Sequence, residues 1–180
     1  LTQDLTRYRT SLAALELGSA AAREGLPDPG LYHRLETCFD LVGVPERDPA
    51  LELLSFDLDL LRGLGIAPVV ELCAACAGTA APVDAGGARA AFSAGAGGRL
   101  CRKCAIGARA QGGRVGTLGV EVLSAASVLM RRSVQERADL PPMPEELFRG
   151  LRDFVDRFLE YHLETKLRSR PLPVAASQAT

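Results

Sequence analysis

Four of the five cysteines of this chain occur as two close pairs. Cys73-x-x-Cys76 is followed, after 24 residues, by Cys101-x-x-Cys104. A Cys-x-x-Cys turn presents two sulfurs from one tight knuckle, and zinc prefers a tetrahedral shell of four thiolates. The glycine-rich connection tolerates the slightly long spacing, because the cost of closing a loop grows only logarithmically with its length. The pattern predicts one zinc ion per chain, or iron in its place.

Four thiolates leave no coordination position open for water or substrate, so the predicted metal site is structural and not catalytic. The other interpretation is a redox-active or coincidental Cys-x-x-Cys turn. Neither pair follows a strand or opens a helix in a βαβ pattern, which argues against a thioredoxin-like motif. The metal site is therefore the favoured interpretation.

The remaining chemistry-bearing residues point to a protein without a catalytic centre. Cys38 shares helical spacing with Leu31 and Leu35, which predicts a buried apolar residue and not a nucleophile. The two histidines, His33 and His162, have no recognisable catalytic context, and we expect one to be solvated and the other to pack at the end of its helix. The glycine pairs near the cysteines lack the lysine and the strand-turn-helix setting of a nucleotide loop.

Positive charge is concentrated around the cysteines. Residues 72–118 carry six basic side chains and one acidic side chain, whereas residues 1–71 carry twelve acids and six bases. A basic island attracts phosphates or acidic peptides, although a solvated surface is an ordinary alternative. The candidate nucleic-acid-binding residues are Arg99, Arg102, Lys103, Arg109 and Arg114. With no Trp and 5% aromatic residues, no base-stacking platform is evident.

A second basic group follows the last predicted helix. It consists of Lys166, Arg168 and Arg170. Cations near a helix C-terminus commonly interact with the helix dipole, but they could also bind an acidic partner peptide.

Periodicity predicts a mainly α fold, with a helical bundle domain into which a four-cysteine, zinc-ribbon-like module is inserted. Helices are expected over residues 2–24, from Asp28-Pro29, from Asp48-Pro49, after Gly119 and over residues 144–163. The expected buried face of the first helix carries Leu5, Tyr8, Leu12 and Leu15, and the third helix is expected to be central. Residues 77–100 lack large apolar side chains and are expected to form a loop without a core, ordered by the metal. The predicted organisation is a helical domain at 1–70 and 116–172, a zinc-binding insertion at 71–115 and a disordered tail at 173–180.

The sequence contains no apolar stretch of the roughly 18 residues that a membrane helix needs and no secretory leader pattern. An odd cysteine count argues against a secreted disulfide framework. A cytoplasmic location is therefore expected. The chain begins with Leu1 directly in a helical pattern, which predicts that an N-terminal portion is missing.

Three segments together resemble a known family. They are Leu61-Arg-Gly-Leu-Gly-Ile-Ala-Pro68 before the first knuckle, Ala91-Phe-Ser-Ala-Gly-Ala-Gly-Gly-Arg-Leu-Cys101 into the second, and Phe158-Leu-Glu-Tyr-His-Leu163 with Leu167-Arg-Ser-Arg-Pro-Leu172 at the end. The chain resembles the C-terminal part of RecO, the family of bacterial DNA-repair and recombination mediators, from the first helix to Leu172.

The resemblance implies a non-enzymatic, nucleoid-associated protein that binds single- and double-stranded DNA. It also implies the partners RecR and the C-terminal tail of single-strand-binding protein, with RecA loaded indirectly. The oligonucleotide-binding β-barrel that usually begins such proteins is not in this sequence, which places part of the DNA-binding activity in doubt. Two other functions stay open from the residues: a zinc-stabilised protein-protein adaptor without DNA binding, and a zinc-ribbon segment of a nucleic-acid-modifying enzyme.

Overall fold

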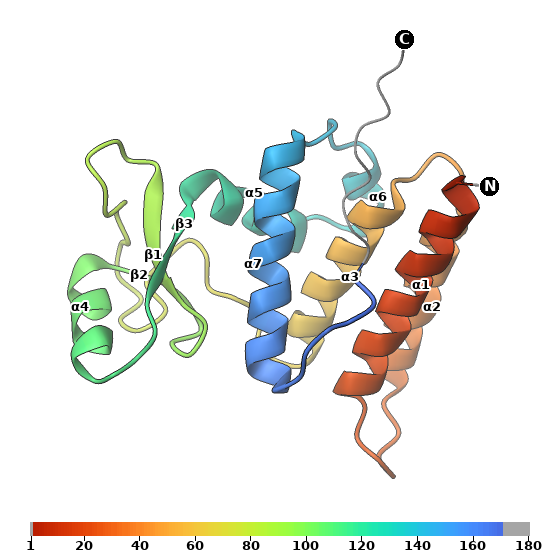
Figure 1. Cartoon of the computed structure of the whole chain (residues 1–180), viewed down its shortest axis with the longest axis horizontal. Helices are drawn as coiled ribbons and strands as arrows, with labels where there is room; N and C mark the ends of the chain where they lie inside the picture. Colours follow the sequence, from red (N-terminus) through yellow and green to blue (C-terminus); the bar gives the residue numbers. More distant parts are fainter. Residues whose placement is uncertain (1, 171–180) are drawn as a thin grey trace. The chain divides into compact units, whose positions relative to one another are not determined.

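The computed structural model describes residues 2–170, which form seven helices and one three-stranded sheet (Figure 1). The helices are α1 (Thr2–Ala21), α2 (Pro29–Gly43), α3 (Pro49–Gly63), α4 (Arg102–Ala110), α5 (Val120–Arg131), α6 (Val134–Ala138) and α7 (Glu145–Leu163). The strands are β1 (Arg89–Ser93), β2 (Gly98–Leu100) and β3 (Gly116–Gly119). The mainly helical fold class is confirmed. None of the described helices is long and apolar enough to cross a membrane.

The chain divides into two compact units. The first comprises the chain up to Phe56 and the segment that begins at Lys166, and the second is Asp57–Thr165. Helix α3 belongs to both, since the division falls within it. The predicted domain boundaries at 70/71 and 115/116 stay a prediction, and the predicted tail at 173–180 lies outside the described residues.

In the first unit, α1 packs against α2 through a face that the sequence pattern did not predict. Its fully buried residues are Thr10, Ala13, Ala14 and Leu17, whereas Leu5, Tyr8, Leu12 and Leu15 are all exposed. The expected buried face of α1 is therefore wrong. Small residues explain the difference: a Cβ on Gly18 would lie 2.9 Å from Cδ1 of Leu35, so the two helices approach too closely for a large side chain between them.

The predicted helix starts are confirmed where a capping residue precedes a proline. The Asp28 carboxylate accepts a hydrogen bond from the backbone N–H of Leu31 at 2.9 Å, which caps α2. The Asp48 carboxylate accepts one from Ala50 at 2.9 Å before α3. The far end of α2 is closed by Arg7, whose guanidinium donates to the backbone carbonyl of Val42 and, at 2.9 Å, to that of Val44.

Helix α3 is buried on almost every side, as its broad apolar stripe predicts. Its large apolar residues with at most 4% exposure are Leu53, Leu54, Phe56, Leu58, Leu60 and Leu61. Such a helix serves as a central element, because its neighbours cover more than one face.

In the second unit, the sheet has the order β2-β1-β3 and is antiparallel throughout. Ala91 pairs with Leu100 on one side and with Thr117 on the other. The ring of Phe92 on β1 meets that of Phe154 on α7 edge to face, with centroids 4.9 Å apart. One face of β1 therefore packs against α7, which itself packs against α5.

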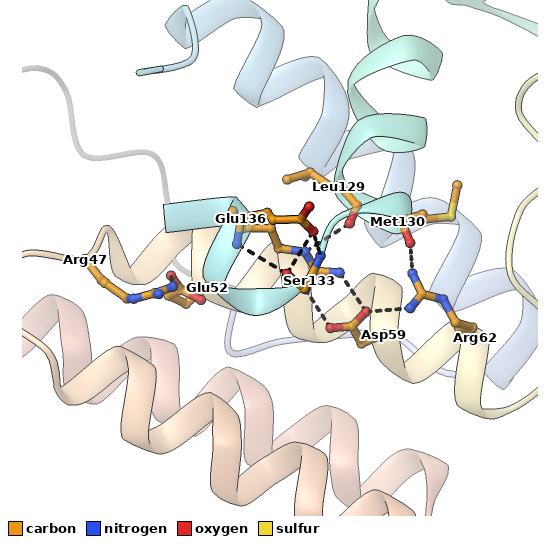
Figure 2. A network of polar contacts seen from close by, with 9 residues as sticks. Arg47, Glu52, Asp59, Arg62, Leu129, Met130, Ser133 and Glu136 are labelled. Atoms are coloured by element: carbon orange, nitrogen blue, oxygen red, sulfur yellow. Dashed lines mark hydrogen bonds and ion pairs between the residues drawn. The ribbon is translucent and has the colours of Figure 1, made fainter. Parts of the chain in front are cut away.

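The short helix α6 is held by a polar network around Asp59 of α3 (Figure 2). Arg137 is 4% exposed and forms an ion pair with the Asp59 carboxylate at 2.7 Å. Its Nε also donates to the backbone carbonyl of Leu129 at 3.0 Å. Ser133 and Glu136 begin α6 with a capping box, in which each side chain contacts the other residue's backbone.

Residues 77–100 do not form the loop without a core that their composition predicts. They contain β1 and β2, and together with α4 they surround a small core of Cys73, Ala80, Ala91, Leu100 and Ala105. Most of these residues are small, so the core shows no run of large apolar side chains that a sequence pattern would reveal. The core adds to the order that a metal would supply.

Candidate metal centre and basic surface

The four paired cysteines converge in space. Their sulfur atoms all lie within 4.8 Å of one another, and the sulfurs of Cys76 and Cys101 are 4.0 Å apart. In a tetrahedral zinc site with Zn–S bonds of about 2.3 Å, neighbouring sulfurs are separated by about 3.8 Å. A disulfide would require about 2 Å. The spacing therefore fits a metal ion between the sulfurs and not a disulfide.

The first knuckle is a tight reversal of the chain between Leu72 and Thr79, which pair as an isolated antiparallel bridge. The backbone N–H of Cys73 donates to the carbonyl of Gly78, and that of Ala77 donates back to Cys73, both at 2.8 Å. Ala77 has a φ of 55°, a left-handed conformation that few non-glycine residues adopt. This reversal brings the sulfurs of the first pair to the same side.

The second knuckle lies where β2 passes into α4. Cys101 is the N-cap residue of α4, and its carbonyl accepts a hydrogen bond from Ala105 at 2.9 Å. The second pair thus follows a strand and opens a helix. The strand belongs to an antiparallel sheet and not to a βαβ unit, so the argument against a thioredoxin-like motif holds.

Backbone contacts join the two knuckles. The N–H of Ala74 donates to the carbonyl of Arg99 at 2.8 Å. Val69, just before the first knuckle, exchanges two hydrogen bonds with the chain on either side of Gly98, donating to Gly97 at 2.9 Å and accepting from Arg99 at 2.7 Å. A Cβ on Gly98 would lie 2.2 Å from the carbonyl oxygen of Val69, so only glycine fits at this crossing.

The thiols differ strongly in their acidity. Burial raises the pKa of the Cys73 thiol, but backbone N–H groups of Cys101, Ala75 and Cys76 donate to its sulfur and lower the pKa to about 6. The thiols of Cys101, Cys73 and Cys76 surround Cys104 and raise its pKa to about 12. One thiolate is thus stabilised while a neighbour keeps its proton. A divalent cation is the group that lets all four sulfurs ionise together, so the donor set fits zinc.

The predicted nucleic-acid-binding residues lie on β2, on α4 and just after α4. Arg102 and Lys103 are exposed in the first turn of α4, between its two cysteines, where no acidic residue balances them. Cations are unfavourable at a helix N-terminus, so an anion bound there would relieve the repulsion. Arg109 and Arg114 are also exposed, whereas Arg99 is half-buried with its guanidinium 3.5 Å from the carbonyl of Val70. Four of the five residues are therefore available to a ligand.

The predicted peptide-binding residues lie after α7, in the first unit. Lys166 and Arg168 are exposed and Arg170 is half-buried. The backbone N–H groups of Arg168 and Ser169 each donate to the Glu16 carboxylate at 2.8 Å. This segment is thus held against α1 by an acidic residue of the same chain, a contact that no sequence pattern indicated.

The other candidate residues behave as the sequence predicts. Cys38 is 3% exposed within α2. The His33 side chain is solvated, with Nδ1 3.6 Å from the Glu36 carboxylate. The ring of His162 packs on Phe158 near the end of α7, with centroids 4.4 Å apart.

The structure also contains a groove that sequence reasoning missed. It has a volume of about 450 Å³ and lies between β3 and α7, with residues of β1 also lining it. Phe92, Phe154, Phe158 and Leu118 form its apolar part, and Arg114 and Arg157 line it as well. No local sequence pattern indicated the groove, because its three phenylalanines come from β1 and α7, which are far apart in the chain.

The family can now be decided. Residues 2–171 match the family described as "Recombination protein O C terminal". The chain belongs to the RecO family. The resemblance that the three sequence segments indicated is confirmed over nearly the whole chain.

Similar RecO proteins occur in several bacteria, each named "DNA repair protein RecO". The chain is 30% identical over 167 residues to the protein of Myxococcus xanthus, covering 93% of this chain and 62% of that one. It is 32% identical to the Moorella thermoacetica protein, with 94% and 60% covered, and 33% identical to that of Anaeromyxobacter sp. strain K, with 94% and 63% covered. This RecO-family chain thus spans about three fifths of the length of these relatives.

Proposed function

We propose that this chain is the zinc-stabilised, DNA-binding part of a recombination mediator that acts in DNA repair. It works by binding and not by catalysis, in the bacterial cytoplasm and in association with the nucleoid. The observation that carries the proposal is the position of Arg102 and Lys103, two exposed cations that lie between two cysteines of the candidate metal centre. The names of the relatives support the repair function.

One Zn²⁺ per chain would be held by the sulfurs of Cys73, Cys76, Cys101 and Cys104. The ion would supply positive charge that stabilises four thiolates and would join the two knuckles. Its contribution is structural, because four protein ligands fill the tetrahedral shell. In small zinc peptides such binding is worth on the order of 10–16 kcal/mol, which is ample to order a module whose core consists mainly of alanines.

DNA binding would be electrostatic and independent of base sequence. Arg102, Lys103, Arg109 and Arg114 present four exposed cations on or just after α4. Each cation that neutralises a phosphate releases a counterion, so the affinity falls steeply as salt increases. Both single- and double-stranded DNA are ligands of such a surface, because phosphate contacts carry no base information.

A salt titration of DNA binding tests this proposal. The affinity of the chain for a single-stranded oligonucleotide is measured by fluorescence anisotropy, with Arg102→Ala and Lys103→Ala as variants. Each substitution should lower the slope of log affinity against log salt by about 0.7 for single strands. Arg149→Ala is the matched control, because this exposed arginine of α7 is paired with Glu145 at 2.6 Å and lies outside α4. An affinity that does not change with salt would refute the mechanism, and no DNA binding at all would favour the protein-only adaptor.

Partner proteins would bind a different part of the chain. We place the acidic C-terminal tail of single-strand-binding protein at Lys166, Arg168 and Arg170, and we include RecR as a partner and RecA as an indirect one. The exposure of Lys166 and Arg168 supports this placement. Titration of the tail peptide against Arg168→Ala and Arg170→Ala tests it, and an unchanged affinity in both variants would show that the peptide binds elsewhere.

A further inference from the structure

The groove between β3 and α7 carries an inference that rests on the proposed DNA binding and makes it more specific. We propose that this groove is a subsite for single-stranded DNA, which accepts one unstacked base while flanking phosphates contact Arg114 and Arg157. Tyr161, one helical turn beyond Arg157, stacks the next base. All of these residues belong to the second unit.

The charge of the groove favours a nucleic acid. Two arginines line it, and none of its lining residues is acidic. Arg114 follows shortly after α4, which carries the exposed cations Arg102, Lys103 and Arg109. The groove and these cations are therefore joined by a short stretch of sequence. A strand held by those cations would reach the groove without crossing an acidic residue of its lining.

The shape and chemistry of the groove suit a base. Its volume of about 450 Å³ exceeds that of a single nucleobase, and its apolar lining includes Val115, Leu118 and three phenylalanines. An added Cβ on Gly116 would meet nothing within 4 Å, so the backbone of β3 is open to a ligand at this point. Bases are flat and largely apolar on their faces, and their burial against aromatic and aliphatic side chains does not depend on sequence.

Tyr161 supplies the exposed aromatic surface that the buried phenylalanines do not. It is 53% exposed, and it shares a face of α7 with Arg157 because the two residues are four apart in the helix. Its hydroxyl lies beside the turn between β1 and β2, where a Cβ on Gly95 would lie 2.6 Å from it. The low aromatic content of the sequence predicted no stacking platform, but four aromatic residues gather here.

The test compares the affinity of the whole chain for oligo(dT) with its affinity for an abasic strand of the same length. Wild type should bind oligo(dT) at least about tenfold more tightly, since each stacked base is worth about that factor and two bases are in contact. Gly116→Leu, which fills the groove, and Tyr161→Ala should each lower oligo(dT) affinity several-fold and leave abasic affinity unchanged. Tyr161→Phe should retain the base preference. Arg157→Ala should weaken both ligands and lower the salt slope by about 0.7.

Each variant has a matched control. Gly107→Leu adds the same side chain to α4, where an added Cβ also meets nothing within 4 Å. Tyr32→Ala removes a tyrosine that is 68% exposed on α2, and Arg149→Ala removes an arginine of α7 outside the groove. All three should retain the wild-type base preference. Circular dichroism melts establish that every variant is folded.

The outcomes separate the two proposals. Equal affinity for the two strands, unchanged by Gly116→Leu, would overturn the groove proposal and leave DNA binding intact. No binding of either strand at low salt would overturn both. If the acidic tail peptide of single-strand-binding protein binds, and Gly116→Leu abolishes that binding without affecting oligo(dT), the groove is a peptide site and this proposal is wrong.

Discussion

Arg137 and Asp59 form a two-pronged ion pair, with Nη1 2.7 Å from Oδ2 and Nη2 2.8 Å from Oδ1. The side chain of Arg137 is 4% exposed and that of Asp59 is 27% exposed. The pair attaches α6 to α3 across 78 residues of sequence. Arg62, one turn further along α3, lies 3.5 Å from the same carboxylate and donates to the backbone carbonyl of Met130.

This pair predicts an asymmetric loss of stability. Asp59→Ala leaves the buried Arg137 guanidinium without its carboxylate and should lower the free energy of unfolding by about 3 kcal/mol. Arg137→Met should cost less, because Asp59 is partly solvated and keeps Arg62. Arg62→Ala, at a half-exposed position, is the control and should cost less than about 1 kcal/mol. Urea unfolding measures all three, and equal losses for Asp59→Ala and Arg62→Ala would contradict the prediction.

Metal content is the second prediction. Elemental analysis of the purified chain should find about one zinc per molecule, and Cys101→Ser should lose it, since one ligand of a tetrahedral site is removed. Cys38→Ala is the control: this cysteine is buried in α2 and is not one of the four clustered cysteines, so the variant should retain the metal. Iron in the same amount would change the metal but not the site. No metal, with all of the clustered thiols freely reactive, would overturn it.

The crossing at Gly98 gives a third prediction. Gly98→Ala should destabilise the segment that holds the four clustered cysteines by about 2 kcal/mol or more, because its Cβ would overlap the Val69 carbonyl oxygen. Gly107→Ala, in the open part of α4, should instead be neutral or stabilise by up to about 1 kcal/mol, because alanine is the better helix former. Thermal melts and the rate of zinc release to a chelator measure the effects. Similar behaviour of the two variants would show that the close approach is not a constraint.

A pH-dependent contact joins Glu16 to the segment after α7. Burial raises the pKa of the Glu16 carboxyl, but the backbone N–H groups of Ser169 and Arg168 outweigh it, and with Arg170 they hold the pKa below its usual value. The contact should therefore stabilise the fold fully above the usual glutamate pKa. It should be lost as the pH falls through the lower value in the folded chain.

An NMR titration of the Arg168 and Ser169 amides measures this contact. Their shifts should report a midpoint below the usual glutamate value of about 4.3. In Glu16→Gln the amide lacks a charge to titrate, so this transition should disappear. A midpoint at or above the usual value would show that the two N–H donors do not hold the carboxylate in solution.

The cysteine ligands and the helix starts could be predicted because the information is local. A Cys-x-x-Cys turn places two sulfurs together within four residues, and Asp28 or Asp48 before a proline caps a helix through its nearest neighbours. The burial of α3 could be predicted as well, since the apolar residues along it are large and numerous. Cys38 was recognised as buried for the same reason.

Other features depend on which segments meet. The sequence of α1 alone favours the stripe with Leu12 and Leu15, but close packing at Gly18 against α2 buries the small face instead. The strands β1 and β3 are short, and their pairing joins residues 89–92 to residues 116–119, a long-range contact that no local pattern predicts.

The sequence by itself thus determined the four cysteines of the candidate metal centre, the family, the basic character of the segment around them and the positions of the main helices. Each of these is encoded by residue types at short spacing or by charge that accumulates along the chain. Only the tertiary structure decided the buried face of α1, the small core that includes Cys73 and the groove between β3 and α7. These features arise from contacts between distant segments, whose free energy depends on the fit of side chains that are not neighbours in sequence.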